Sequence, residues 1–303
     1  MTRTFLAHFL KSLLPTLLWM LAFSVMALEP PQWWKDVHHY NPDKDWYQYM
    51  TYTAGFFGPN ALPVPEIFDG RVPLKHQAEV STDVFWGYGD QTQSLSTRLV
   101  YAAITGKLTL SGWGVLAEHY RTTLAVRDQR ASQIENPEET FLIGDFYLST
   151  LIGLLREKRW QPDLNLEIVL KTSSSKTSAS ARYFDTPGYY FNLTAGKSIH
   201  FKGSFLDELR FVGNYGFLCY QLNEEHQNDA PLFGGKMLLS ASNWTIESGI
   251  QGYSGWLDQG DKPLVLRGKI NYRSGPATLF IQYQHALRDY PFRRLQTGIC
   301  LDL

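Results

Sequence analysis

The feature that most constrains this chain is the alternation of two kinds of side chain near its C-terminal end. In residues 294–303 one side of an extended strand would carry Leu295, Thr297, Ile299, Leu301 and Leu303, and the other side Gln296, Gly298, Cys300 and Asp302. The segment Leu264 to Arg273 repeats the pattern with three cations on one side, Arg267, Lys269 and Arg273. A strand of this kind belongs to a sheet with one apolar face and one polar face.

From about residue 75 onward the chain divides into about twelve such segments, and the links between them alternate in length. Short turns are predicted at residues 105–107, 241–243 and 273–276. Longer links are predicted at residues 121–139, 172–188, 223–229, 256–263 and 287–293. Outer-membrane barrels have short periplasmic turns and long external loops. The pattern therefore predicts an all-β fold, a transmembrane antiparallel up-and-down β-barrel of about 12 strands in residues 75–303.

Alternation alone does not say which face is inside, so a secreted β-sandwich with an apolar core is the competing interpretation. The number of long amphipathic strands, the aromatic content of 15% and the alternating link lengths favour the barrel. In a barrel the charged face lines the lumen and the apolar face meets lipid. The residues predicted to line the lumen are Arg98, Glu167, Lys171, Arg210, Glu247, Arg267, Lys269 and Arg294.

The N-terminal residues resemble a secretory signal peptide. Arg3 and Lys11 flank an apolar stretch that is too short to span a bilayer, and Val25-Met26-Ala27 fits a small-residue cleavage site. Residues 1–27 are therefore predicted to be removed on export. The expected location is the outer membrane of a Gram-negative bacterium, with membrane lipid and the barrel assembly machinery as partners.

Residues 28–74 do not alternate. They contain two adjacent tryptophans, two adjacent histidines and the proline-rich run Pro63-Val64-Pro65. A barrel of twelve strands is wider than side chains alone can fill. This stretch is therefore predicted to be either a lumen-plugging segment, entering or capping the periplasmic mouth, or a periplasmic extension.

Charge and cysteine content exclude several classes of function. With 28 basic and 29 acidic residues, the chain has no excess of positive charge for a nucleic-acid partner. Two cysteines, Cys219 and Cys300, are too few for a disulfide framework and lack metal-ligand spacing, so both are interpreted as ordinary strand residues. The pair His38-His39 has no evident third ligand. We therefore expect no metal and no cofactor.

Several acidic residues and one histidine are predicted to lie on one rim of the barrel. The catalytic candidates among them are Asp90, Asp185, His226, Asp229 and Asp261, and Asp145 is expected to lie deeper in its strand. Carboxylates and an imidazole are suited to acid/base chemistry, but loops are normally rich in such residues. Because no serine-centred motif accompanies them, the sequence leans against an enzyme.

Three segments resemble a family of outer-membrane β-barrels of Bacteroidota for which no reaction or substrate is established. They are residues 181–191 (ARYFDTPGYYF), the Gly89-Asp90-Gln91-Thr92 hairpin, and residues 260–265 (GDKPLV). The resemblance extends over roughly residues 33–303 and implies a location and a fold rather than an activity. Outer-membrane proteins usually end in an aromatic residue, whereas this chain ends in Leu303.

The aromatic run Tyr189-Tyr190-Phe191 follows a Pro187-Gly188 reversal and is interpreted as part of an aromatic belt at the membrane interface. The function predicted from these features is a narrow pore or transport-associated barrel for small polar solutes. Two alternatives stay open: an outer-membrane hydrolase or acyltransferase that uses the rim acids and His226, and a structural or adhesin-like barrel.

Overall fold

The computed structural model describes residues 29–175, 180–183, 186–223 and 226–303. The chain forms two compact units, residues 1–46 and 47–303. The described part of the first unit contains helix α2 (Gln32–His38), in which Trp34 is fully buried. The Trp34 ring packs on His38 and Tyr40, with ring centroids 4.5 Å and 5.7 Å apart. The predicted signal peptide, residues 1–27, lies outside the described residues.

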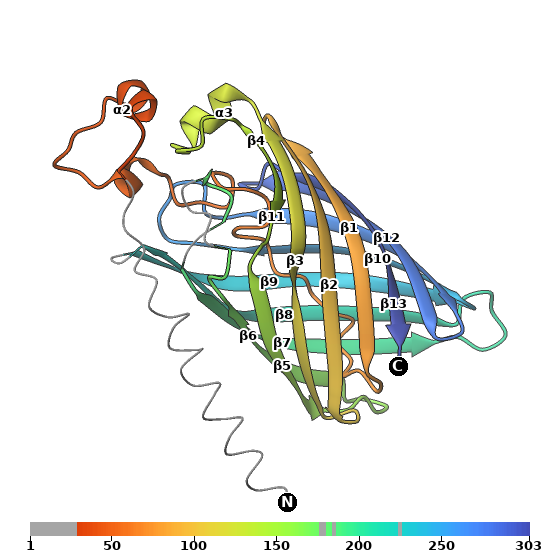
Figure 1. Cartoon of the computed structure of the whole chain (residues 1–303). Coiled ribbons are helices and arrows are strands. Elements are labelled where there is room, and N and C mark those ends of the chain that lie inside the picture. Colours follow the sequence, from red (N-terminus) through yellow and green to blue (C-terminus); the bar gives the residue numbers. More distant parts are fainter. Residues whose placement is uncertain (1–28, 176–179, 184–185, 224–225) are drawn as a thin grey trace, which may run out of the picture. The chain divides into compact units, whose positions relative to one another are not determined.

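The second unit is a β-barrel (Figure 1). A short 3-10 helix, η1 (Trp46–Tyr49), begins at the last residue of the first unit. Helix α3 (Leu124–Gln129) lies in the chain between the third and fourth strands. The strands are β1 (Gln77–Gly87), β2 (Asp90–Ile104), β3 (Leu108–Thr122), β4 (Glu138–Leu142), β5 (Phe146–Leu155), β6 (Asp163–Lys171), β7 (Gly188–His200), β8 (Glu208–Asn223), β9 (His226–Ala241), β10 (Trp244–Tyr253), β11 (Leu264–Ser274), β12 (Ala277–Arg288) and β13 (Arg293–Asp302).

All the pairings are antiparallel, and the sheet closes on itself. Strand β1 pairs with β2 on one side and with the last strand, β13, on the other, so that Glu79 lies opposite both Arg98 and Cys300. Twelve strands form the wall, and β4 is an extra strand that pairs only with β3. The predicted fold class is thus confirmed.

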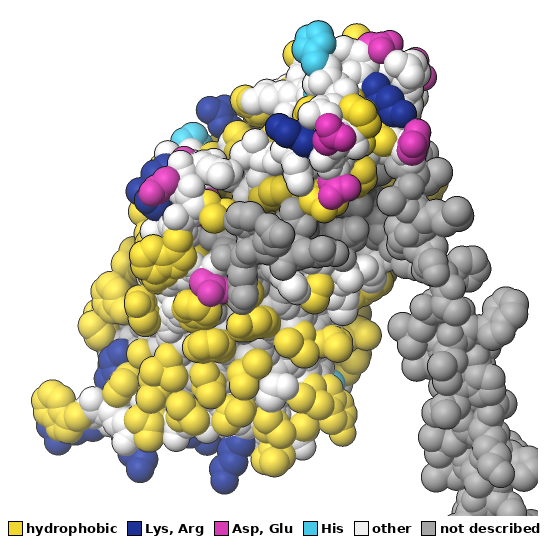
Figure 2. Space-filling view, turned by 90° about the vertical axis from the view of Figure 1, so that its left-hand side faces the viewer, with side chains coloured by type: hydrophobic (Ala, Val, Ile, Leu, Met, Phe, Trp, Pro, Cys, Tyr) yellow, Lys and Arg dark blue, Asp and Glu magenta, His cyan; other side chains and the backbone are white. Residues whose placement is uncertain are grey.

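The orientation of the side chains decides between a membrane barrel and a water-soluble sandwich. In β12, Leu279 and Ile281 point outward and are 51% and 45% exposed, whereas the inward Gln282 is 1% exposed. In β11 the outward Leu266 is exposed and the inward Arg267 is buried. Figure 2 shows the apolar side chains covering the outside of the wall, with Lys and Arg at one edge. A wall with apolar side chains outside and polar side chains inside is typical of a barrel that is surrounded by lipid.

The two ends of the barrel differ in their connections. We call the end that holds the connections after β1, β3, β6, β8, β10 and β12 the loop end, and the opposite end, which also holds the C-terminus, the turn end. The long link predicted at residues 223–229 is wrong, because β8 continues to Asn223 and β9 already begins at His226. Polar residues can continue a ladder, so polarity alone does not mark the end of a strand.

Residues 59–74, which we call the lumen segment, run inside the barrel from the loop end to the turn end. At the loop end, the Tyr290 hydroxyl donates to the Pro59 carbonyl at 2.7 Å. Midway, the Arg267 guanidinium donates to the Val64 and Pro65 carbonyls at 2.7 Å and 3.2 Å. At the turn end, Arg210 donates to the Asp69 and Gly70 carbonyls at 2.7 Å and 3.0 Å.

The proline content explains why this segment does not become another strand. Pro59, Pro63 and Pro65 have no backbone N–H to donate to a ladder. Their carbonyls are still strong acceptors, which must be satisfied when they are buried. Side chains of the wall supply the donors instead, as Tyr220 does for Pro63 at 2.9 Å. Ile67 adds an apolar contact with Val212 and Leu238.

Candidate functional site

The residues predicted to line the lumen are on the inner side of the wall, where most of them are held by specific partners. Arg294 pairs with Asp83 at 2.6 Å, and Lys171 pairs with Asp145 at 2.5 Å. Glu247 accepts from Lys236 at 2.6 Å. Glu167 is buried and accepts from Asn192 at 3.2 Å. The inward cations are therefore mostly neutralised within the barrel, which limits the desolvation cost of placing them there.

Two predicted lumen cations contact aromatic rings. The Arg98 guanidinium lies over Phe68 of the lumen segment at 4.0 Å and over Trp113 at 5.1 Å. The Lys269 ammonium lies over the Phe280 ring at 4.2 Å. Ring faces carry negative potential and attract a cation without removing its charge. These two side chains are thus held in place while their charge stays available to a solute.

Arg210 holds the turn end of the lumen segment. Its guanidinium bonds to Glu157 and Asp163 at 2.8 Å each, in addition to the two carbonyls of the segment. Partial burial acts to raise the pKa of Glu157, but the Ser198 backbone N–H, Lys197 and Arg210 outweigh it and hold that pKa at about 2. Glu157 is therefore ionised at neutral pH and fixes the arginine that anchors the segment.

A buried charge cluster lies at the loop end. Arg182 bonds to Asp90 at 2.6 Å and to Glu118 at 2.8 Å, and Arg130 also bonds to Asp90, at 2.5 Å. Tyr183 donates to Glu118 at 2.6 Å. Burial acts to lower the pKa of Arg182, but the charges of Glu118 and Asp90 outweigh it and raise that pKa above its usual value. Arg182 and Tyr183, in the connection after β6, thus point inward and are bound to the wall.

This cluster changes the interpretation of the rim acids. Asp90 is a structural partner of two arginines and of Thr92. Asp261 accepts from the Leu257 backbone N–H of its own loop at 2.7 Å, and Asp229 lies half-buried on β9. Within the described part of the chain, these three carboxylates share no hydrogen-bond partner. Asp185 and the side chain of His226 lie outside the described residues, so their catalytic role stays a prediction.

One expectation for the aromatic run is wrong. Tyr189 and Phe191 face outward and are exposed, but Tyr190 is buried inside the barrel. Neighbouring residues of a strand point to opposite faces, so three in a row cannot share one belt. The structure also adds a residue that the sequence did not single out: Glu66 of the lumen segment, for which the irregular sequence around it offers no pattern.

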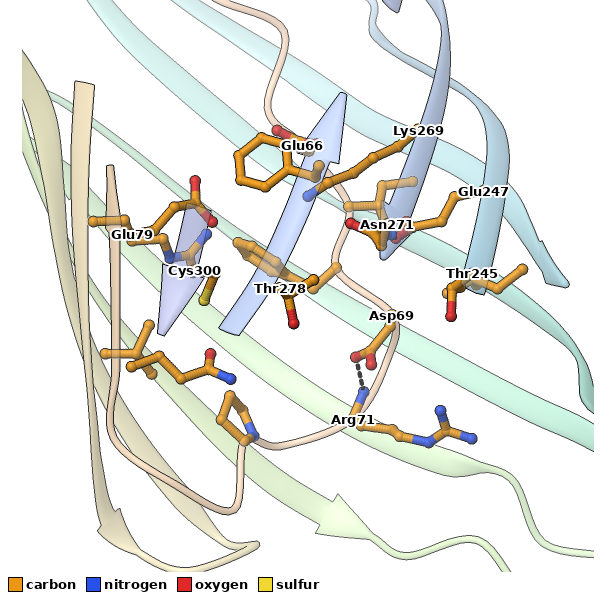
Figure 3. Close-up of a pocket in the computed structure, with 18 of the residues that line it drawn as sticks. Glu66, Asp69, Arg71, Glu79, Thr245, Glu247, Lys269, Asn271, Thr278 and Cys300 are labelled. Carbon is orange, nitrogen blue, oxygen red and sulfur yellow. Dashed lines mark hydrogen bonds between the residues drawn. The ribbon is translucent and has the colours of Figure 1, made fainter. Parts of the chain in front are cut away.

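Two neighbouring cavities lie beside the lumen segment. The turn-end cavity has a volume of about 500 Å³, and the inner cavity, which reaches toward the loop end, has a volume of about 180 Å³. Figure 3 shows the turn-end cavity with charged side chains from the lumen segment, β1 and β11 around it. The residues common to both linings are Glu66, Phe68, Glu79, Arg98 and Gln296, which we call the junction. The two cavities therefore meet at a charged point beside the lumen segment.

Comparison with solved structures agrees with this architecture. No family model and no curated protein matches the chain. An outer-membrane channel from Pseudomonas putida F1 superposes with a TM-score of 0.52 at 14% identity, over 79% of this chain and 100% of the channel. The NanC porin superposes with a TM-score of 0.50 at 10% identity, over 75% of this chain and 100% of the porin. The fold is that of an outer-membrane β-barrel.

The inner face of this barrel carries charged and polar side chains that can bind a solute. Among the described residues, no helix is long and apolar enough to cross a membrane. In the same residues, no group of three His, Cys, Asp or Glu side chains is arranged to hold a metal ion. Both cysteines are free thiols, Cys219 buried on β8 and Cys300 half-buried on β13.

Proposed function

We propose that this outer-membrane barrel is a narrow pore for small polar solutes, with the lumen segment as its constriction. The observation that carries the proposal is the pair of cavities, of about 500 and 180 Å³, that meet at the charged junction inside a closed wall. Small cavities lined by charges admit compact hydrophilic solutes and exclude large ones. Polar solutes need such a route because a bilayer core accepts charge poorly.

The lumen segment makes the pore narrow in its resting state. It is held mainly through its backbone carbonyls, by Arg267 and Arg210 and by the hydroxyl of Tyr220. Each of these hydrogen bonds comes from a single side chain of the wall, so a substitution of that side chain removes one anchor of the segment and leaves the others. Residues 59–74 therefore act as a plug that partly fills the lumen, within the larger stretch 28–74.

Planar-bilayer recordings of the purified full-length protein test the pore directly. The variant Arg267→Gln removes the guanidinium that binds Val64 and Pro65 and is expected to raise the mean conductance several-fold by loosening the segment. The matched control Arg121→Gln removes a solvent-exposed guanidinium, paired with Glu138, that lines neither cavity, and it is expected to conduct like the parent. The absence of current above the lipid background in all three proteins would rule out the pore.

The hydrolase and the adhesin have no comparable support; among the described rim acids, Asp90 and Asp261 are held by separate partners. We further propose that residues 1–27 are cleaved as a signal peptide and that the barrel assembly machinery inserts the chain through β13. Membership of the Bacteroidota barrel family is proposed on the three resembling segments. N-terminal sequencing of the mature protein tests the first point, with a start at Leu28 expected.

A further inference from the structure

The junction contains opposite charges that do not neutralise one another. Among the described residues, the side chains of Glu66, Glu79 and Arg98 make no hydrogen bond or ion pair, and the Arg98 guanidinium lies over the rings of Phe68 and Trp113. This is unusual inside this barrel, where Arg210, Arg267 and Arg294 all have polar partners. Charged groups that line a water-filled cavity without a partner are available to a ligand.

The arrangement of the wall keeps these charges apart. Glu79 and Arg98 are opposite residues of the β1–β2 ladder, a position at which opposite charges commonly pair. Instead, the Arg98 guanidinium lies on the Phe68 ring of the lumen segment. Lys269, on β11, lies over Phe280 and makes no ion pair with a described carboxylate. The aromatic contacts therefore hold both cations away from the nearby acids.

The lumen segment contributes one of the negative charges. Glu66 faces the part of the wall that carries Arg267, Lys269, Arg294 and Lys236, whose charges act on it. Glu79 lies within the electrostatic reach of Lys269, Arg98 and Glu66. Figure 3 shows Glu66 on the lumen segment near Lys269, and Glu79 on the strand to their left. A solute that passes the junction therefore meets carboxylates and cations within one small space.

We propose that the junction is a binding site for a small zwitterion of amino-acid size. Its ammonium group binds Glu66 and Glu79, and its carboxylate binds Arg98 and Lys269. Charge-assisted hydrogen bonds of this kind strengthen where water is partly excluded. The turn-end cavity of about 500 Å³, which all four side chains line, has room for such a molecule. The inference rests on the proposed pore and names the class of solute that it passes.

Swelling of proteoliposomes in isotonic solute measures this preference. Glycine and glycolamide are isomers of equal size, one zwitterionic and one uncharged, so a difference in rate reports charge alone. After subtraction of the rate for empty liposomes, glycine is expected to enter about fivefold to tenfold faster than glycolamide through the full-length protein. Equal rates for the two solutes, well above the lipid background, would overturn the zwitterion site while leaving the pore intact.

Three variants assign the preference to the junction. Glu66→Gln and Glu79→Gln each remove one charge with little change in size, and Arg98→Gln removes the cation and shortens the side chain. Each is expected to reduce the ratio of glycine entry to glycolamide entry below about twofold. The matched control Glu135→Gln changes an exposed loop-end carboxylate and is expected to keep the preference. A preference that survives in all three junction variants contradicts the site. No entry of either solute, also through Arg267→Gln, contradicts the pore itself.

A second inference follows from the direction of the lumen segment. Residues 51–58 lie at the loop end, where the Gly58 N–H donates to the Ala181 carbonyl at 3.0 Å and Thr51 and Phe56 line a cavity with Gln259 and Pro291. The C-terminus lies at the opposite end of the barrel. Because long loops of outer-membrane barrels face the outside, we infer that residues 51–58 are displayed on the cell surface.

Labelling of intact cells with a membrane-impermeant maleimide tests this topology. In a background with Cys219→Ser and Cys300→Ser, the exposed positions Thr51→Cys and Gln259→Cys, both at the loop end, are expected to react. Ser274→Cys, exposed at the turn end, is expected to react only after the envelope is permeabilised. Protection of Thr51→Cys, or reaction of Ser274→Cys in intact cells, overturns the inference.

Discussion

The two ends of the lumen use the same chemistry in different surroundings. At the loop end, Arg182 binds the carboxylates of Asp90 and Glu118, whose side chains are both 0% exposed. At the turn end, Arg210 binds Glu157 and Asp163, whose side chains are 20% and 13% exposed. A dry ion pair is costly to break because each partner is left buried, whereas a wetted carboxylate can be rehydrated. The loop-end ion pairs are therefore the harder ones to break, and the turn end is an anchor that can be released.

The largest expected effect comes from removing the loop-end arginine. Arg182→Met leaves Asp90 and Glu118 buried with fewer partners and is expected to lower the free energy of unfolding by about 3–5 kcal/mol. Arg210→Met is expected to cost less, about 1–3 kcal/mol, because its carboxylates reach water. Urea unfolding in detergent, followed by tryptophan fluorescence, measures both. Equal losses would mean that the two ends do not differ in burial as described.

Two glycines sharpen the same comparison. A Cβ at Gly58 would lie 2.7 Å from the Arg182 guanidinium carbon and 2.8 Å from the Arg182 carbonyl oxygen, so Gly58→Ala is expected to cost about 2 kcal/mol. At the turn end, Gly70 has a φ of +72° but its nearest neighbour would be 3.2 Å away, and Gly70→Ala is expected to cost about 1 kcal/mol. The same unfolding experiment ranks them, and a larger loss at Gly70 would contradict the tighter loop end.

The partly exposed ion pair between Glu157 and Arg210 predicts that stability and conductance depend on pH. The pKa of Glu157 is held at about 2, below its unfolded value near 4.5, so its contribution is fully present above pH 4.5 and is lost as the pH falls toward 2. The mean conductance is therefore expected to rise only below about pH 3, where Glu157 is protonated in the folded barrel and Arg210 loses a partner. Glu157→Gln is expected to show a smaller rise over this range. An unchanged rise in that variant would assign the effect to another group.

The smallest effect is expected from an exposed ion pair at the turn end. Arg273 pairs with Asp302 at 2.8 Å, and its side chain is 59% exposed. Exposed pairs contribute little because water screens them, so Arg273→Gln is expected to change the free energy of unfolding by less than about 0.5 kcal/mol. Urea unfolding checks this value. A loss above about 1 kcal/mol would show that exposure is a poor guide to the energetics of these pairs.

The sequence predicted the strands of the barrel wall better than the path of the chain inside the barrel. Alternation has a period of two, so it indicated which side of β11 and β12 faces lipid, and the exposure of Leu266 and Ile281 agrees. The same rule, applied to Tyr190, corrects the belt that the aromatic run suggested. The route of residues 59–74 was not predictable in this way, because their carbonyls are satisfied by side chains distant in sequence, such as Arg267.

The candidate site was harder to foresee for the same reason. Asp90 was singled out because of its position after a turn, yet its partners Arg130 and Arg182 are 40 and 92 residues away in sequence. Glu66 carried no signal because it lies among prolines without any periodic pattern. Arg98 was expected in the lumen, but its position over the Phe68 ring, in place of a carboxylate, is seen only in the structure.

The position of β1 has a consequence for how the chain folds. Strand β1 begins directly after the lumen segment and is also the strand that joins β13 to complete the cylinder. Pulling a long N-terminal stretch through an already completed ring of strands would be slow, since its anchoring contacts form only once it is inside. The ring of strands must therefore be completed around the lumen segment. The pairing of β1 with β13 then both completes the wall and encloses the segment that precedes β1.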